Sequence, residues 1–297
     1  MRFLDSHHHL WDLERHSYPW LQGPLVKAHF GDYDAIRHTY DLDDYRRDSA
    51  AVELVSSIHV EAAIAVDERL GETRWLQAVH EEAGLPGAVV AAVGLNEDDL
   101  SNKLAAHSEF PLVRGVRDML FLPGAPNRAE NLADSRLFDP AWRSGFSLLS
   151  QFGMSFDLQA PPFAMADAAR LVAAHDDVAV VLTHLGPPFD RSDEGREIWR
   201  QGIRKLAQLP HVHTKISGLP MTDWNWSEDT LRPWVLEAID VFGPDRCMFG
   251  SNFPVDGLFG SYGDLIGAYW QIVDGFSDDE RNAMFVGNAA RFYRVPL

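Results

Sequence analysis

Apolar residues recur along the chain in two alternating patterns. Short runs of nearly continuous apolar character, rich in Val, Ile and Ala, are typical of strands buried on both faces. Segments of helical period lie between them. The predicted strands cover residues 3–9, 55–61, 88–94, 112–117, 154–159, 178–184, 212–217 and 246–252. The predicted helices cover residues 68–82, 97–107, 140–152, 162–174, 194–208, 228–241, 262–273 and 278–292.

This alternation predicts one parallel (β/α)8 barrel, the TIM barrel, with residues 1–297 as a single domain. An open doubly wound sheet is the alternative, but no G-x-G-x-x-G phosphate turn follows an early strand. Residues 12–50 interrupt the alternation after the first strand. Because a loop this long is uncommon unless it covers a site, and because it carries aromatic residues such as Trp20, we expect a packed, lid-like loop.

The first strand carries two histidines, His7 and His9, separated by one residue. Side chains two positions apart share one face of a strand, so Asp5, His7 and His9 are expected to point the same way. Two imidazoles at this spacing can bind one metal ion on a strand, whereas on a helix they would diverge by about 200°. Histidines bonded to the backbone, or the remnant of an expression tag, are the alternatives. The run is only three residues long and lies within strand sequence, which favours a site.

Polar side chains also occur where the other predicted strands end. In a parallel barrel, function collects at the carboxyl ends of the strands, where packing alone would favour Val, Ile or Leu. Each candidate has a structural alternative: His59 as a satisfied core histidine, Ser217 as a packing hydroxyl, or Lys215 as the partner of a carboxylate. Their coincidence at the strand ends predicts an active site. The candidates are His59, Glu61, Arg117, Asp157, Gln159, His184, Lys215, Ser217 and Asn252.

Four segments carry a resemblance to a known family. They are Asp5-x-His7-x-His9-x-Trp11, Gly115-Val-Arg117, Thr183-His184-Leu-Gly-Pro-Pro and Phe249-Gly-Ser-Asn252-Phe-Pro254. In this order and spacing they resemble the amidohydrolase superfamily, and within it the metal-dependent TIM-barrel hydrolases that open sugar-acid lactones or 2-pyrone-4,6-dicarboxylate lactone. The resemblance extends over almost the whole chain.

The resemblance implies roles for these residues. His7, His9 and His184 would be the ligands of one divalent ion, zinc or manganese, that activates water and polarises a carbonyl. Some members of the branch resemble this site and work without metal, so the histidines could bind the carbonyl directly. Arg117 is expected to hold a substrate carboxylate and Lys215 to stabilise the oxyanion. The other expected substrate-binding residues are His59, Asp157, Gln159 and Ser217.

The eighth strand departs from the family pattern. Its usual aspartate is replaced by Asn252, whose amide takes no proton near neutral pH. Three groups could replace the carboxylate: Glu61 from across the barrel mouth, Asp256 from the following loop, or a histidine. Glu61 is preferred because it is predicted to point into the mouth, with Asn252 orienting water or substrate. The expected catalytic set is His7, His9, Glu61, His184 and Asn252.

Charge and cysteine content restrict the partners. The net charge of −18 disfavours nucleic acid and anionic membranes, although a few arginines in one cleft still permit a small anionic substrate. The lone Cys247 excludes an internal disulfide and fits a reducing compartment. With no leader and no apolar run of membrane-spanning length in the sequence, we expect a cytoplasmic protein. Tryptophans in residues 221–226 could shape the pocket or form a homo-oligomer interface.

The leading hypothesis is a hydrolase that opens a small lactone by water attack at the barrel mouth. Covalent catalysis by Ser or Cys is disfavoured, because no G-x-S-x-G elbow occurs and Cys247 begins a buried strand. One alternative is a metal-dependent decarboxylase of an aromatic or unsaturated acid, because a neighbouring branch of the superfamily uses a similar site. The other is a non-catalytic small-molecule binder, in which Asn252 would mark the lost function.

Overall fold

Eight strands and eleven α-helices make up the described part of the chain, which in this computed structural model comprises residues 1–26, 28, 30–120, 132–133 and 135–297. The strands are β1 (Arg2–His8), β2 (Glu53–Val60), β3 (Ala88–Ala92), β4 (Val113–Arg117), β5 (Ser155–Leu158), β6 (Val180–Leu182), β7 (Val212–Ile216) and β8 (Cys247–Phe249). The helices are α1 (Pro19–Gln22), α2 (Leu42–Asp48), α3 (Arg69–Ala83), α4 (Leu100–Ser108), α5 (Pro140–Leu148), α6 (Met165–Ala173), α7 (Asp193–Ala207), α8 (Glu228–Phe242), α9 (Tyr262–Ile272), α10 (Asp278–Asn282) and α11 (Asn288–Tyr293).

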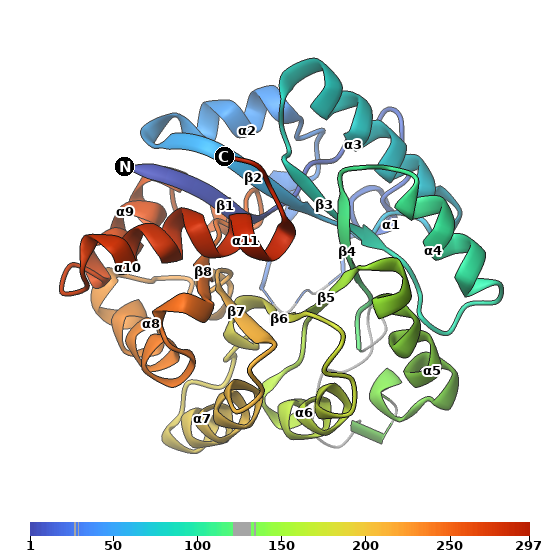
Figure 1. Ribbon diagram of the computed structural model, residues 1–297. Coiled ribbons are helices and arrows are strands. Elements are labelled where there is room, and N and C mark those ends of the chain that lie inside the picture. The colour runs from blue at the N-terminus through green and yellow to red at the C-terminus, as the bar shows by residue number, and fades with distance from the viewer. Residues whose placement is uncertain (27, 29, 121–131, 134) are drawn as a thin grey trace.

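The strands form one parallel sheet in the order β1 to β8, and the helices surround it (Figure 1). Backbone hydrogen bonds join the two ends of the sheet. The Asn252 N–H donates to the carbonyl of His7 at 2.7 Å, and the His9 N–H donates to the carbonyl of Phe253 at 2.8 Å. The predicted (β/α)8 barrel is therefore confirmed, and its seam joins β1 to the segment that follows β8.

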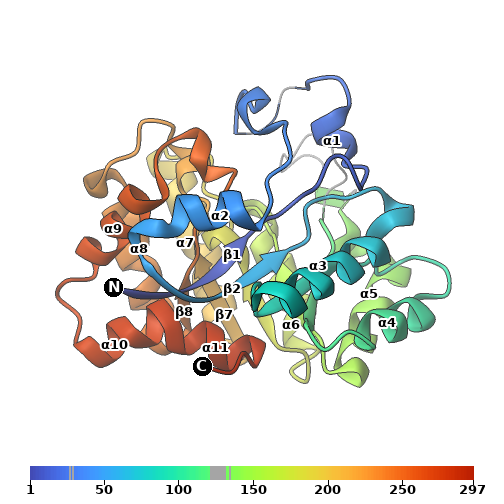
Figure 2. The ribbon, with the colours of Figure 1, turned by 90° about the horizontal axis from the view of Figure 1, so that it is seen from above.

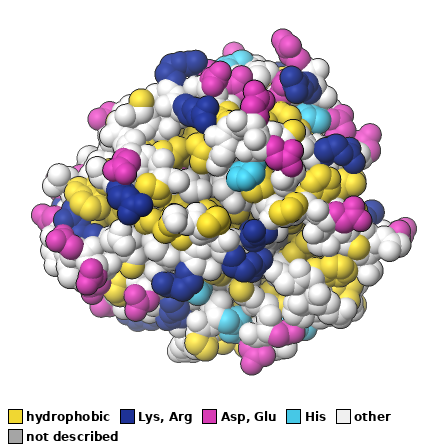
Figure 3. Space-filling model, turned by 45° about the horizontal axis from the view of Figure 1, so that its top comes forward, with side chains coloured by type: hydrophobic (Ala, Val, Ile, Leu, Met, Phe, Trp, Pro, Cys, Tyr) yellow, Lys and Arg dark blue, Asp and Glu magenta, His cyan; other side chains and the backbone are white. Residues whose placement is uncertain are grey.

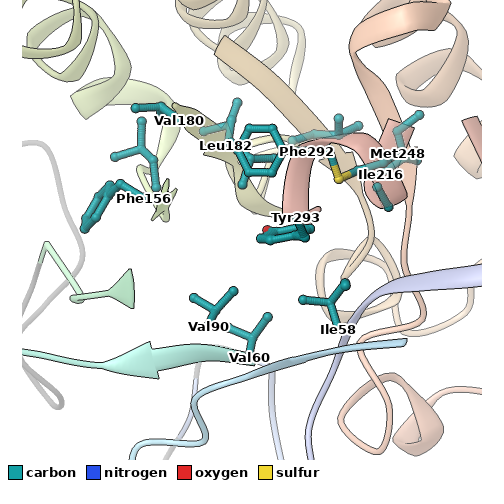
Figure 4. Packing of buried hydrophobic residues seen from close by; sticks show 14 of the residues in the cluster. Ile58, Val60, Val90, Phe156, Val180, Leu182, Ile216, Met248, Phe292 and Tyr293 are labelled. Carbon is teal, nitrogen blue, oxygen red and sulfur yellow. The ribbon is translucent and has the colours of Figure 1, made fainter. Parts of the chain in front are cut away.

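The two ends of the barrel are covered differently. Helices α10 and α11 lie at the end where β1 begins, and the segment that carries α1 lies at the opposite end, where the strands finish (Figure 2). Tyr293 of α11 lies among strand side chains such as Ile58 and Val60 (Figure 4). The amino-terminal end of the barrel is thus a packed core, which leaves function to the other end.

Local sequence signals explain several element boundaries. Helix α8 begins at a capping box formed by Ser227 and Thr230, and α3 ends at Gly84, whose φ of 77° is readily adopted by glycine. The predicted helix over residues 278–292 is instead divided into α10 and α11 by a π-helical turn at Ala283–Gly287. The predicted sixth strand is shorter, because the backbone turns sharply after Leu182.

Acidic and basic side chains are interspersed on the face shown in Figure 3, with acidic groups frequent around its rim. This agrees with the net charge of −18. Within the described ranges, no helix is both long and apolar enough to cross a bilayer.

Candidate active site

Strand β1 delivers His7 and His9 through an irregularity in its pairing. Its register with β2 shifts after Asp5. The Asp5 carboxylate accepts hydrogen bonds from the hydroxyls of Tyr45 on α2, at 2.9 Å, and Tyr262 on α9, at 3.1 Å, so it faces the helical layer. The prediction that Asp5 shares a face with His7 and His9 is therefore wrong, because the shift interrupts the strict alternation of sides.

Three predicted histidines lie together at the carboxyl ends of β1 and β6. The ring centre of His7 is 5.0 Å from that of His9 and 4.5 Å from that of His184. All three side chains are buried. The structure thus places His184 beside two histidines that lie at least 175 positions earlier in the sequence.

Hydrogen bonds orient two of the rings. The Nδ1 of His9 lies 2.7 Å from the carbonyl oxygen of Val60, and because a carbonyl only accepts, Nδ1 carries the proton and Nε2 keeps its lone pair. The Nδ1 of His184 lies 2.9 Å from the Ser217 hydroxyl. Neither nitrogen of His7 has a hydrogen-bond partner among the described residues. The cluster therefore holds buried nitrogens that no described protein group satisfies.

Burial keeps this cluster uncharged. Burial, together with the nearby Arg117 guanidinium, lowers the pKa of His9 to about 4. The pKa values of His7 and His184 are also well below the usual range, again mainly because of burial. The three rings are consequently neutral imidazoles near pH 7, the form that accepts hydrogen bonds and binds metals.

The backbone that presents His184 is strained. His184 and Leu185 have φ values of 55° and 56°, in the left-handed region that non-glycine residues seldom adopt. Opposite the ring, Gly218 has a φ of 63°, and a Cβ there would lie 2.4 Å from Nδ1 of His184. Glycine is therefore required at position 218. Sequence analysis missed this residue, although a glycine directly after the predicted seventh strand was a visible signal.

Glu61 and Arg117 form an ion pair. The Nε of Arg117 donates to Glu61 Oε1 at 2.6 Å, its Nη2 donates to the Glu61 carbonyl at 2.6 Å, and the Ala63 N–H donates to Oε2 at 2.7 Å. Burial alone would raise the pKa of Glu61, but the guanidinium and the Ala63 amide bring it below its usual value. Glu61 thus reaches the expected place, yet both carboxylate oxygens are engaged.

The remaining hydrogen-bonding capacity of Arg117 lies at Nη1. This nitrogen is 3.5 Å from Oε1 of Gln159, a long contact, and the side chain is 8% exposed. Gln159 follows β5 directly, so it lies where the sequence predicted. Nη1 is therefore the part of the guanidinium best able to donate to a bound molecule.

Asp157 and Lys215 form a second ion pair, which is completely buried. Lys215 Nζ lies 2.6 Å from Asp157 Oδ2, and the hydroxyl of Tyr293 donates to Oδ1 at 2.8 Å. Tyr293 belongs to the helix that covers the other end of the barrel, and nothing in the sequence pattern pointed to it. Lys215 is thus the partner of a carboxylate, which was its alternative to a role at the active site. Roles for Lys215 and Asp157 toward a substrate remain predictions.

His59 does not point into the mouth. It pairs in register with His8, whose ring stacks on Tyr45 of α2, and its Nε2 is 4.0 Å from a carboxylate oxygen of Glu72 on α3. His59 therefore faces the helical layer, although it lies two residues before Glu61 and strict strand alternation would place both side chains on one face. The reason is that β2 ends at Val60, so strand alternation no longer governs the next residue.

Asn252 lies three residues after the end of β8, beside the histidines. Its φ of 57° is left-handed, a conformation that Asn tolerates better than most residues. Its Nδ2 donates to Oδ1 of Asp256 at 2.9 Å, and its side chain also interacts with His9. The structure therefore places Asp256, one of the three groups that could replace the carboxylate, in contact with Asn252, and both are buried.

The histidines are suitable ligands for a divalent ion by their chemistry, but their side chains are not positioned to share one ion. Neutral imidazole nitrogens without protein partners, as in His7, are suitable ligands. As they lie, however, the described His, Cys, Asp and Glu side chains form no group of three or more that could hold a metal ion. We therefore derive no catalytic step through a metal.

The segment after β1 contacts the loops that follow β2 and β7 near the carboxyl end of the barrel. In the segment after β1, Trp20 donates its indole N–H to the carbonyl of Ala62 at 2.8 Å. Gly31 of the same segment lies against Trp224 after β7, since a Cβ on Gly31 would be 2.9 Å from that ring. This segment is packed, as expected, and its function as a lid remains a prediction.

Comparisons with known proteins agree with this geometry. A family model described as Amidohydrolase matches residues 4–295. The uncharacterized protein y4mH of Sinorhizobium fredii is 40% identical over 98% of both chains, and an L-fucono-1,5-lactonase of Burkholderia multivorans is 30% identical over 99% of this chain and 96% of that one. A crystal structure of an amidohydrolase from Burkholderia multivorans with bound zinc superimposes with a TM-score of 0.82 and 28% identity, covering 100% of both chains.

Proposed function

Because the chain belongs to the amidohydrolase family, we propose that it hydrolyses a lactone, and specifically an uncharged sugar-acid lactone. One observation carries the proposal: three buried, neutral imidazoles lie beside the Asn252 amide where the strands of the barrel end. Similarity to the L-fucono-1,5-lactonase of Burkholderia multivorans supports the same reaction class.

The histidines and Asn252 act on water. Nε2 of His9 keeps its lone pair because Nδ1 donates to Val60, so it can accept a hydrogen bond from water. Asn252 directs its carbonyl oxygen toward the same region, because its Nδ2 is bound to Asp256. An imidazole of the cluster takes a proton as the water oxygen attacks the ring carbonyl. We assign the base role to this cluster instead of Glu61.

Arg117 acts on the lactone carbonyl. Its Nη1 donates to the carbonyl oxygen, whose negative charge grows as the tetrahedral intermediate forms. Glu61 keeps the guanidinium in place through two of its other nitrogens. The ring C–O bond then breaks, and the imidazolium returns its proton to the leaving alkoxide. The product is a hydroxy acid, whose ionisation near neutral pH releases one proton per turnover.

The charges of the site favour an uncharged substrate. Arg117 and Lys215 each lie within 2.6 Å of a carboxylate, so their charges are already balanced inside the protein. A dicarboxylate lactone would have to displace one of these buried partners, which is costly. A sugar-acid lactone presents hydroxyls instead of carboxylates, and Trp20 and Trp224 supply aromatic surface near the mouth.

A divalent ion would add one contribution. If His7, His9 and His184 moved close enough together to hold it, the ion would lower the pKa of water and polarise the carbonyl. The steps assigned above to His9, Asn252 and Arg117 depend only on contacts within the protein.

A proton-release assay tests the proposal. Purified protein is incubated in weak buffer with an indicator dye and an aldono-1,5-lactone, with L-fucono-1,5-lactone included, and spontaneous opening is subtracted. We expect enzyme-dependent acid release that His9→Ala abolishes. Carbon dioxide release from an aromatic acid, without lactone opening, would instead indicate a decarboxylase. Thermal stabilisation by a lactone without turnover would indicate a binding protein.

A further inference from the structure

The side chains of Asn252 and Asp256 are joined by one hydrogen bond, in which Asn252 is the donor. Nδ2 of Asn252 donates to Oδ1 of Asp256 at 2.9 Å. In the same turn, the backbone N–H of Asp256 donates to the backbone carbonyl of Asn252 at 3.1 Å. Both side chains are 1% exposed. The turn fixes the distance between the two side chains, and burial removes water as a competing partner.

An amide has two different ends, and this contact distinguishes them. Oδ1 of Asp256 accepts this contact, and because burial raises the pKa of the carboxyl, any proton that it holds lies on Oδ2, which has no partner among the described residues, so only the NH₂ group of Asn252 can face Oδ1. The carbonyl oxygen Oδ1 of Asn252 must then point away from Asp256 and toward His9, from which it can accept a hydrogen bond once His9 carries a second proton. Without the carboxylate, the amide could rotate by 180° and present NH₂ to the histidines, with nearly the same shape.

Asp256 has one oxygen that no structural contact within the described residues uses. Its Oδ2 is buried and has no hydrogen-bond partner there. A buried carboxyl group is costly, and one that served packing alone would be expected to have both oxygens satisfied. The free-energy cost of burying Asp256 has a physical reason if its carboxyl group orients the Asn252 amide.

We propose that Asp256 is a positioning residue that holds the Asn252 carbonyl toward the histidine cluster, so that the two residues work as one amide–carboxylate unit. Asp256 thereby supplies a carboxyl group that is missing at position 252. It lies four residues later, on the side of the Asn252 amide that faces away from His9. The expected effects on kcat and KM rest on the proposed lactone hydrolysis, whereas the coupling of the two side chains in Tm does not.

Exchanging the two side chains tests the unit. Asn252→Asp places two carboxyl groups in contact that must share a proton, so we expect kcat/KM to fall about 30-fold at pH 8 and less at pH 6. Asp256→Asn lets the Asn252 amide face either way, with an expected loss of about 10-fold in kcat and little change in KM. In the double variant, the amide introduced at position 256 can donate to the carboxylate introduced at position 252, and kcat/KM should recover to within about 5-fold of wild type.

Asn288→Ala is the matched control. Asn288 is equally buried, and its Nδ2 donates to the carbonyls of Pro244 and Cys247 at the opposite end of β8. It should lower Tm without altering the pH profile of kcat/KM. If Asp256→Asn keeps the wild-type kcat, or if the exchanged pair is no better than the worse single variant, Asp256 has no positioning role.

The coupling can also be measured without any substrate. In a thermal-unfolding cycle of Asn252→Ala, Asp256→Ala and the double variant, the double variant should lose less Tm than the two single losses combined. Additive losses would overturn the unit. If wild type hydrolyses no lactone but the cycle shows coupling, the proposed function has failed while the pair stands.

Discussion

Glu61 and Arg117 form a buried ion pair where β2 and β4 end, with Arg117 Nε 2.6 Å from Glu61 Oε1. The second oxygen of Glu61 accepts from the Ala63 amide, so both oxygens already accept a hydrogen bond, and the lowered pKa of Glu61 makes it a weaker base. This arrangement makes Glu61 a support for the arginine. We therefore propose a histidine as the general base. The sequence had left Glu61, Asp256 and a histidine as alternatives.

Replacing Glu61 by Gln should separate these two roles. Glu61→Gln keeps the shape but leaves Arg117 with an unbalanced buried charge, so we expect kcat/KM to fall by about 30-fold and Tm to decrease. The acidic limb of the pH profile should stay in place, because the base is elsewhere. Loss of that limb would show that Glu61 is the base.

Glu97→Gln is the control for this substitution. Glu97 also pairs with cations, Arg69 and Lys103, but it is partly exposed and belongs to the loop after β3. We expect near wild-type kcat/KM, since a partly exposed pair contributes little. A similar loss in both variants would mean that disturbing any ion pair lowers activity.

Glu72 should make the protein less stable as the pH rises. Burial raises the pKa of Glu72 to about 8, and the nearby Glu61 charge adds to the effect. Between the unfolded value of 4.5 and about 8, the folded chain holds a proton that the unfolded chain has released. The free energy of unfolding therefore falls with increasing pH across this range, by at most about 1.4 kcal/mol per pH unit.

Glu72→Gln removes this titration and keeps an acceptor for the Tyr18 hydroxyl, which donates to Glu72 Oε1 at 3.1 Å. The Tm of the variant relative to wild type should rise from pH 5 to about pH 8 and then level off. Glu82→Gln, at an exposed position of the same helix, should show no such trend. A constant difference for Glu72→Gln at all pH values would contradict the assignment.

Zinc binding can be measured directly on metal-free protein. If His7, His9 and His184 close on one ion, added zinc should raise Tm as its concentration passes the dissociation constant. His7→Ala should abolish the shift, whereas His213→Ala should keep it, because His213 packs against Phe292 away from the cluster. Equal shifts in both variants, or none in wild type, would refute the three-histidine site.

The sequence allowed the barrel and the histidine cluster to be predicted, because both depend on regular patterns. Strand period and strand-end position were sufficient for His7, His9 and His184. The same reasoning failed for Asp5 and His59, where a register shift and an early strand end break the alternation. Such irregularities depend on pairing between strands, which the period of a single strand does not contain.

The pairing of polar groups was less predictable still. Lys215 was recognised as a partner for Asp157 or Glu61, but only the three-dimensional arrangement decides between them. The contact between Asn252 and Asp256 depends on a left-handed backbone at Asn252, which sequence alone does not specify. Hydrogen-bond direction at a site is therefore the information that the structure adds.

Lactone hydrolysis and its substrate class are tested together by comparing two lactones at equal concentration. We expect acid release from an uncharged aldono-1,5-lactone with a kcat/KM about 100-fold above that for 2-pyrone-4,6-dicarboxylate, because Arg117 and Lys215 are already paired. His9→Ala should be inactive on both. Turnover of the dicarboxylate alone would contradict the substrate assignment, and folded protein that opens neither lactone would contradict lactone hydrolysis itself.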